Sequence, residues 1–445
     1  MKRSAWRYLW KSEDIRKKIL ITLLLLAIFR LAANIPVPGI NTAVIASVFQ
    51  QSGAAGTLLN LLDLLAGGTM SKFSILAMGV YPYITAQIIL QLLMPIIPAL
   101  ERKFKDNPRE GRQWMERWTI IGTIPMALLS AVGQINIFNS MAATSNVSIF
   151  TFTDGWNLPT FAVVATMVAG TMFGVWIGQL ISEFGIPNQG LSLVIFAGIV
   201  SRIPANLVGL LSDKTYWWLI FVVLAILVLT IFAIVFVTQG RRNVPVMFPG
   251  RRMGARMSMP VKSSLPLMVN MAGMIPLIFA QSLLTFPAII ASFLYNSKTE
   301  WLAKLAQGVY NTFSGEGVIY AVLYFLMVVA FTFFYTDVLF TQQNYGDNLK
   351  KQGARIMGVV PGEPTQRYLT KVQRRITLPG ALFLGLIAVL PYILNAVLPA
   401  AARQAGLFLI SAAGLLIVVG VVRDTFTIIE TELKLHGYDE SLIRG

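Results

Sequence analysis

Apolar residues in this chain gather in long runs that are separated by shorter polar and charged segments. A helix needs about 20 predominantly apolar residues to cross the roughly 30 Å hydrocarbon core of a bilayer, and most of the runs approach or exceed that length. The pattern therefore predicts ten membrane-spanning helices. They lie at about residues 19–33, 73–93, 118–138, 158–180, 191–211, 216–237, 265–294, 317–340, 378–398 and 406–422.

The composition agrees with a membrane protein that has several spans. Of 445 residues, 56% are hydrophobic and 13% are charged, which is more apolar surface than a soluble core can bury. The chain has no cysteine, which excludes disulfides, thiolate chemistry and cysteine metal sites. Its one histidine, His436, lies in the C-terminal tail and is expected to be a solvated residue rather than a ligand.

Positive charge is concentrated in the two ends of the chain and in alternate connections between the apolar runs. Of the 36 Lys and Arg residues, 29 lie in the tail up to Lys18, in the segments 102–117, 241–262 and 350–375, and from Arg423 to the C-terminus. These segments share one side if ten spans alternate, and Lys and Arg stay cytoplasmic, so both termini are expected in the cytoplasm. The net charge of +16 is then explained by topology and by attraction to anionic lipid.

One apolar segment, TLLNLLDLLA, is too short to span the membrane. As a helix it would measure roughly 15 Å, and Gly67 and Gly68 follow it directly. We expect a half-helix that is surrounded by protein or lines a cavity, with an interfacial helix on the outer surface as the alternative. Its residues are Thr57, Leu58, Leu59, Asn60, Leu61, Leu62, Asp63, Leu64, Leu65 and Ala66.

Ten spans divide into two halves of five, residues 1–212 and 213–445. Halves with an odd number of spans enter the membrane in opposite orientations, which is the arrangement of an inverted repeat with its functional site between the halves. Gly170, Gly174 and Gly178 lie four residues apart and predict a face for close helix contact. Pro82 and Pro276 lie inside apolar runs and are expected to kink or weaken them.

The spans carry little chemistry of their own. Charged residues are scarce at mid-membrane depth, and those near the spans lie close to predicted ends: Glu183, Arg202, Asp337, Arg423 and Asp424. Ion-coupled transporters and intramembrane enzymes need ionisable groups within the membrane. No phosphate-binding loop, paired carboxylates in a span or metal-ligand cluster is visible, so no catalytic residue, cofactor or metal is expected. The pattern favours a conduit or scaffold.

Several stretches together resemble one family, SecY, the main subunit of the Sec protein-translocation channel. The resemblance runs from about Ile15 to Tyr438. The most specific stretches are IPVPGI (35–40), PYITAQIILQLL (82–93), GTMFGVWIG (170–178), GLSLVIFAGIVSRIP (190–204), LPLMVNMAGMIPLIFAQS (265–282), DNLKKQGARIMGVVPGEPT (347–365) and LLIVVGVVRD (415–424).

The resemblance implies an all-α membrane fold whose two five-helix halves close like a clamshell, with the segment 57–66 as a plug. It also implies a ring of six aliphatic side chains at the constriction. Aliphatic groups offer a passing polypeptide no hydrogen bond, and a narrow apolar throat excludes water and ions when idle. The implied ring consists of Val80, Ile84, Leu191, Ile195, Ile278 and Ile417.

The family opens towards lipid between its second and third helices on one side and its seventh and eighth on the other. Gln91 and Asn270 resemble the polar residues of that lateral gate. Amide hydrogen bonds between membrane helices are weak, about 0.6 to 2 kcal/mol, so such a gate can open at low cost. Static contact between packed helices remains the alternative role for both side chains.

Two cytoplasmic loops, 238–264 and 341–377, resemble the family's docking surface for the ribosome and for the SecA motor. Ribosomal RNA is a polyanion, so clustered cations favour its binding. The implied docking residues are Arg241, Arg242, Arg251, Arg252, Arg256, Lys350, Lys351, Arg355, Arg367, Lys371, Arg374 and Arg375. One position departs from the family, because G-x-R-P-G-E reads GVVPGE here and Val360 replaces an Arg linked to motor-driven export.

The resemblance implies the pore-forming subunit of a bacterial-type Sec translocon in the inner membrane. Such a subunit passes unfolded polypeptides outward or releases apolar segments into lipid, with no cofactor and no hydrolysis of its own. The implied partners are SecE-like and SecG-like small subunits, the SecA ATPase, the ribosome, signal sequences, nascent chains and membrane lipids. An inverted-repeat transporter of a small solute is the competing hypothesis, which the scarcity of mid-membrane charge disfavours.

Overall fold

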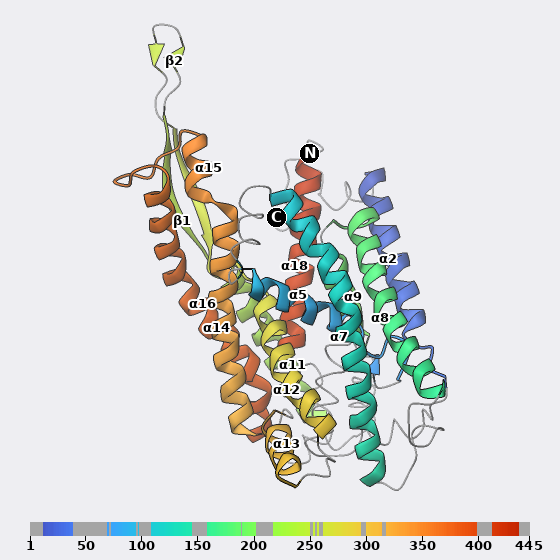
Figure 1. Ribbon diagram of the computed structural model, residues 1–445. Coiled ribbons are helices and arrows are strands. Elements are labelled where there is room, and N and C mark those ends of the chain that lie inside the picture. The colour runs from blue at the N-terminus through green and yellow to red at the C-terminus, as the bar shows by residue number, and fades with distance from the viewer. Residues whose placement is uncertain are drawn as a thin grey trace.

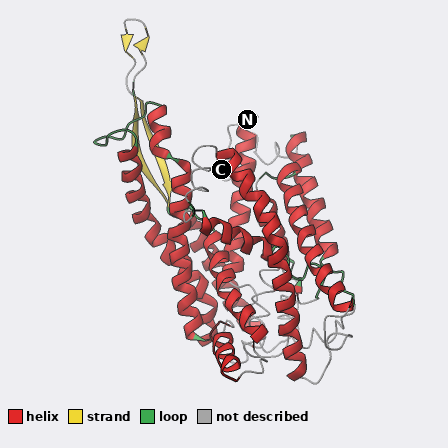
Figure 2. Ribbon diagram, viewed as in Figure 1, coloured by secondary structure: helices red, strands yellow, loops and turns green. Residues whose placement is uncertain are grey.

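The computed structural model describes residues 12–38, 69–70, 73–94, 97, 108–144, 158–187, 189–201, 217–249, 252–253, 256–257, 261–294, 300–313, 317–397 and 412–435. The helices are α2 (Glu13–Ala32), α5 (Tyr81–Leu93), α7 (Pro108–Thr144), α8 (Leu158–Phe184), α9 (Gly190–Val200), α11 (Trp217–Gln239), α12 (Ile275–Leu294), α13 (Glu300–Phe313), α14 (Val318–Gln343), α15 (Tyr345–Lys351), α16 (Glu363–Val397) and α18 (Ala412–Leu435). The strands are β1 (Arg241–Phe248), β2 (Arg252–Met253), β3 (Arg256–Met257) and β4 (Val261–Met268). A bundle of long helices makes up most of the molecule, and a β-hairpin projects from one end (Figures 1 and 2).

Each predicted apolar run overlaps a described helix, and the helical fold class is confirmed for the described residues. Four helical segments in this part are long and apolar enough to cross a membrane: 113–135, 158–184, 318–351 and 363–393. Shorter apolar helices lie at 190–200, 225–239 and 275–291. The full set of ten spans therefore stays a prediction, as does the inverted arrangement of the halves.

The loop after α11 forms an antiparallel hairpin that the all-α expectation did not include. β1 pairs with β4 from Arg241 opposite Met268 to Phe248 opposite Val261. Val244 and Val246 are buried while Asn243 and Pro245 are exposed, which is the two-residue period of a strand with one covered face. The prediction of a span beginning at residue 265 is wrong at its start, because residues 265–268 belong to β4 and the helix begins at Ile275.

The kinks predicted at two prolines are also wrong. Pro82 and Pro276 are the second residues of α5 and α12. The backbone N–H groups of a first turn have no partner within the helix, so a proline there removes no hydrogen bond. Proline lies within the helix instead at Pro125 of α7, at Pro287 of α12, and at residues 379 and 391 of α16.

The predicted glycine face on α8 is confirmed. A Cβ atom on Gly170 would lie 1.8 Å from the backbone oxygen of Ile75, in the turn that precedes α5. A Cβ on Gly178 would lie 2.7 Å from the Leu191 side chain on α9, and one on Gly174 would meet Leu76 and Phe29 at 3.5 Å. Glycine therefore lets α8 approach both the start of α5 and α9 closely.

Replacing Gly170 with Ala is expected to destabilise the fold, because the added methyl meets a backbone oxygen that cannot rotate away. Overpacking of this kind typically costs about 1–3 kcal/mol and would lower the Tm by several degrees. Gly308→Ala on α13 is the matched control, since nothing lies within 4 Å of its added Cβ. Thermal unfolding in detergent measures both variants, and equal Tm values for the two would contradict the close contact.

Candidate functional site

Six aliphatic residues from distant parts of the sequence belong to or pack against the main hydrophobic cluster, which extends through most helices of the bundle. They are the six positions that the family resemblance assigns to a constriction: Val80, Ile84, Leu191, Ile195, Ile278 and Ile417. Five are buried members of the cluster, and Leu191 is partly buried against it. The structure thus places all six in the apolar interior of the bundle, where α12 packs on α5 and α18 packs on α9.

Helical spacing explains how two of these elements present paired side chains. Val80 directly precedes α5 and Ile84 follows four residues later, while Leu191 and Ile195 are four residues apart on α9. Residues separated by four positions lie one above the other on the same helix face. The two members of each pair therefore lie on one side of their element, and neither side chain of a pair carries a polar atom.

The two expected gate residues are buried but do not bond to each other. Gln91 and Asn270 are 8% and 3% exposed, and the side-chain oxygen of each has no hydrogen-bond partner. The Asn270 amide nitrogen donates to the Gly273 backbone oxygen at 3.1 Å. Asn270 is held this way because it lies in the turn between β4 and α12, where Gly273 has a positive φ of 64°.

A hydrogen bond between α5 and α12 was missed by the sequence analysis. The Tyr81 hydroxyl donates to the Ser282 backbone oxygen at 3.4 Å, with both residues buried. This contact joins a helix of the first predicted half to a helix of the second. No sequence signal marks it, because neither residue belongs to a charged pair or a spaced polar motif.

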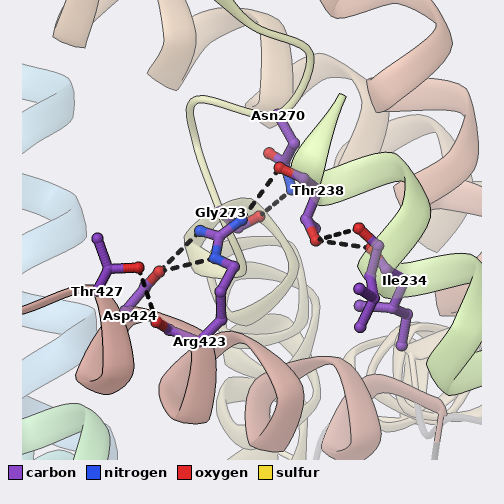
Figure 3. A network of polar contacts seen from close by, with 8 residues as sticks. Ile234, Thr238, Asn270, Gly273, Arg423, Asp424 and Thr427 are labelled. Atoms are coloured by element: carbon purple, nitrogen blue, oxygen red, sulfur yellow. Dashed lines mark hydrogen bonds and ion pairs between the residues drawn. The ribbon is translucent and has the colours of Figure 1, made fainter. Parts of the chain in front are cut away.

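The root of the hairpin is tied to two helices by side chains that donate to backbone oxygens. Arg423 on α18 donates to Thr238 O at 3.2 Å and binds Asp424 through two nitrogens (Figure 3). Thr238 is in the last turn of α11, where carbonyl groups lack helical partners and a cation is favoured. At the end of β4, Gln373 of α16 donates a hydrogen bond to the backbone oxygen of Met268 at 3.1 Å.

The two loops that were predicted to be cytoplasmic, 238–264 and 341–377, pack together as one unit. A second hydrophobic cluster joins the hairpin residues Val244, Val246 and Leu267 to Leu349 of α15 and Leu369 of α16. The backbones of residues 247 and 355 also exchange two hydrogen bonds of 2.8 Å. The hairpin, α15 and the start of α16 therefore form a single platform, which we call the docking platform after the role that the family resemblance implies for it.

The docking platform carries most of the cationic residues that the resemblance singles out. The exposed ones are Arg241, Arg242, Lys350, Lys351, Arg355, Arg367, Lys371, Arg374 and Arg375. Two of them are already ion-paired, Arg367 with Glu363 at 2.6 Å and Arg374 with Asp337 at 2.9 Å. Lys350 and Lys351 have no such partner among the described residues. The platform can therefore offer unneutralised positive charge to a polyanion.

Some predicted site residues cannot be assigned a contact. The plug segment 57–66 and Arg251 lie outside the described residues, and Arg252 and Arg256 are described only through the backbone of β2 and β3. Val360, at the position where the family carries Arg, is 68% exposed just before α16. Within the described part of the chain, no cluster of three His, Asp or Glu residues could hold a metal ion.

Comparisons with known proteins give a consistent result. The SecY family model matches residues 74–426. The protein translocase subunit SecY of Streptomyces griseus is 36% identical over 98% of this chain and 99% of its own length. That of Escherichia coli strain K12 is 34% identical over 96% of this chain and 94% of its own length.

Solved structures share the fold. A protein conducting channel aligns with a TM-score of 0.61 at 17% identity, covering 99% of this chain and 100% of its own. Sec61 in the canine ribosome-channel complex from the endoplasmic reticulum aligns with a TM-score of 0.58 at the same identity and coverage. The cationic platform and these matches agree with the resemblance in the sequence: the chain belongs to the SecY family.

Proposed function

We propose that this chain is the protein-conducting channel of a Sec translocon, which passes unfolded polypeptides across a membrane and releases apolar segments into lipid. The observation that carries the proposal is that six aliphatic residues, Val80 and five on α5, α9, α12 and α18, all lie in or against the apolar interior of the bundle. A conduit for every kind of side chain needs walls that form no hydrogen bonds and exclude ions when idle. Membership of the SecY family supports the same activity.

Purified protein in liposomes tests the proposal. With its partner subunits, a motor and ATP, the liposomes should take up a signal-bearing precursor and protect it from added protease, while radiolabelled small solutes should stay outside. A precursor without its signal is the control. Uptake of solutes without precursor protection would favour a secondary transporter and contradict the proposal.

We further propose that the docking platform lies on the cytoplasmic side of an inner membrane, with both chain termini. The start of α2 and the end of α18 lie together, since Ile15 packs on Ile429 and Lys18 forms an ion pair with Glu432. The hairpin projects from the end of the bundle that carries these helix ends (Figure 1). Its concentration of Lys and Arg agrees with a cytoplasmic location.

The proposed partners of the docking platform are the ribosome and a SecA-type motor, with SecE-like and SecG-like subunits in the membrane. Arg355 is the best candidate to take over the motor contact that Val360 cannot make. Its backbone is held by Met247 on the hairpin, and its side chain is exposed. Arg367 is less suited because Glu363 already accepts its guanidinium hydrogen bond. A guanidinium offers a planar set of donors that valine lacks.

The remaining family features complete the proposal. Residues 57–66 would plug the channel on the outer side, and halves 1–212 and 213–445 would move apart at a gate between α5 and α7 on one side and α12 and α14 on the other. The Tyr81–Ser282 hydrogen bond, the packing of α12 on α7, and the buried amides Gln91 and Asn270 support a seam at this place. These contacts are few and uncharged, which suits an interface that must separate.

A further inference from the structure

The short helix α13 has three faces of different character. Successive residues of an α-helix are separated by about 100°, which places Ala306 and Tyr310 on one face. Both are buried against the bundle. Glu300, Lys304 and Gln307 lie on a second face, are exposed, and include an ion pair of 2.8 Å between Lys304 and Glu300. The first face therefore packs on protein and the second suits water.

The third face is mainly apolar and exposed, and its one polar side chain, Thr312, donates its hydroxyl hydrogen to the Gly308 backbone oxygen at 2.8 Å. Trp301 and Leu305 are one turn apart and are 65% and 57% exposed. On a helical projection the centres of the three faces are roughly 120° apart, so this apolar stripe points away from both the bundle and the charged side. An amphipathic helix in water normally has two faces, one against protein and one against solvent. The additional apolar face needs a third environment.

The position of α13 identifies that environment. The helix lies at the end of the bundle opposite the hairpin, between α12 and α14 (Figure 1). The neighbouring helix ends also expose apolar side chains, Ile290 and Leu294 on α12 and Val318 and Ile319 on α14. In a membrane protein, exposed apolar groups on spanning helices face lipid tails. The stripe on α13 lies at the same end of the bundle as these exposed groups, where a lipid-facing surface would meet water.

We propose that α13 lies at the membrane–water interface on the side opposite the docking platform, with Trp301 and Leu305 inserted into the lipid. Its 14 residues span about 21 Å, too little to cross the hydrocarbon core. Tryptophan concentrates at the headgroup level because its ring is apolar and its indole N–H is polar. The three faces of α13 then contact protein, water and lipid respectively, and the helix holds the outer ends of α12 and α14 at a defined depth.

Nitroxide labels can measure this arrangement because the chain has no native cysteine. Single variants Trp301→Cys, Leu305→Cys, Gln307→Cys and Ala306→Cys would be labelled and placed in nanodiscs of phosphatidylethanolamine and phosphatidylglycerol. We expect labels at 301 and 305 to collide several-fold more with oxygen, which concentrates in lipid, than with a water-soluble nickel chelate. The label at 307 should show the reverse, and the label at 306 should be shielded from both.

Two results would overturn the proposal. Nickel collisions at 301 and 305 as frequent as at 307 would place the stripe in water. Immobilised labels at 301 and 305 that neither reagent reaches would mean that a protein covers the stripe. Leu305→Cys retains Trp301, so its label reports the depth of the helix with the native tryptophan present. The measurement needs no translocation activity, so its outcome is separate from that of the proposed channel function.

Discussion

Replacing Ile84 and Ile195 together with Ser is expected to make the idle channel leak ions. Both side chains are buried in the apolar cluster, at 7% exposure each. Burial of an Ile side chain is worth about 1.5–3 kcal/mol, and a hydroxyl in its place binds water, so the free energy of wetting the constriction falls. Because about 1.4 kcal/mol corresponds to a factor of ten, we expect idle conductance in planar bilayers to rise at least about tenfold.

A conservative pair separates this effect from a general loss of packing. Ile84→Val with Ile195→Val also removes volume from the cluster but leaves its walls apolar, so the idle channel should stay closed to ions. Both double variants must first show a single folded species by size-exclusion chromatography in detergent. A Ser pair that folds and is as silent as the parent would argue that these residues only pack helices and do not seal a pore.

Neutralising Lys350 and Lys351 is expected to weaken ribosome binding by about tenfold near physiological salt. Neither has an ion-pair partner among the described residues, so both are available for RNA phosphates. Each phosphate contact that is lost lowers the number of released counterions by a little less than one. The double variant Lys350→Gln and Lys351→Gln should therefore reduce the salt slope of log K by roughly 1.5 to 2.

The docking platform supplies a control with the same change in charge. Arg367→Gln with Arg374→Gln also removes two positive charges, but these guanidinium groups already bind Glu363 and Asp337 at 2.6 and 2.9 Å. Their removal leaves the two carboxylates unpaired at the surface, yet it eliminates fewer contacts to phosphate. Binding to ribosomes across a salt series compares the two pairs. Equal losses for both would mean that net charge alone decides docking, and unchanged binding for the lysine variant would place the site elsewhere.

The sequence by itself determined the features that depend on local composition. Runs of apolar residues predicted where helices lie, because a helix in lipid satisfies its own backbone and needs only an apolar surface. The spacing of Gly170, Gly174 and Gly178 predicted close packing, because glycine has no side chain and leaves room for a close neighbour whichever element that neighbour belongs to. The alternation of charge between connections likewise needs no tertiary information to predict sidedness.

Some local signals were present but were outweighed by stronger ones. Val244 and Val246 are separated by one residue, which suits a strand, yet their partner strand VKSSLPLM runs directly into an apolar segment and reads as part of a span. Short strands become stable only through cross-strand pairing, which residues about 20 positions away must supply. Pro82 and Pro276 posed a similar problem, because their effect depends on where the helix begins, and that boundary is set by the preceding turns.

Only the tertiary structure decided which distant residues meet. The six aliphatic side chains of the apolar cluster could be grouped in advance only through the family resemblance, because each alone is an ordinary core residue of its helix. The contacts of Tyr81 with Ser282 and of Arg423 with Thr238 had no signal at all, since both use a backbone oxygen as the acceptor. Every residue carries such an oxygen, so side-chain type and spacing cannot reveal which one will be exposed at a helix end or a helix contact. That choice follows from the packing of whole helices against one another.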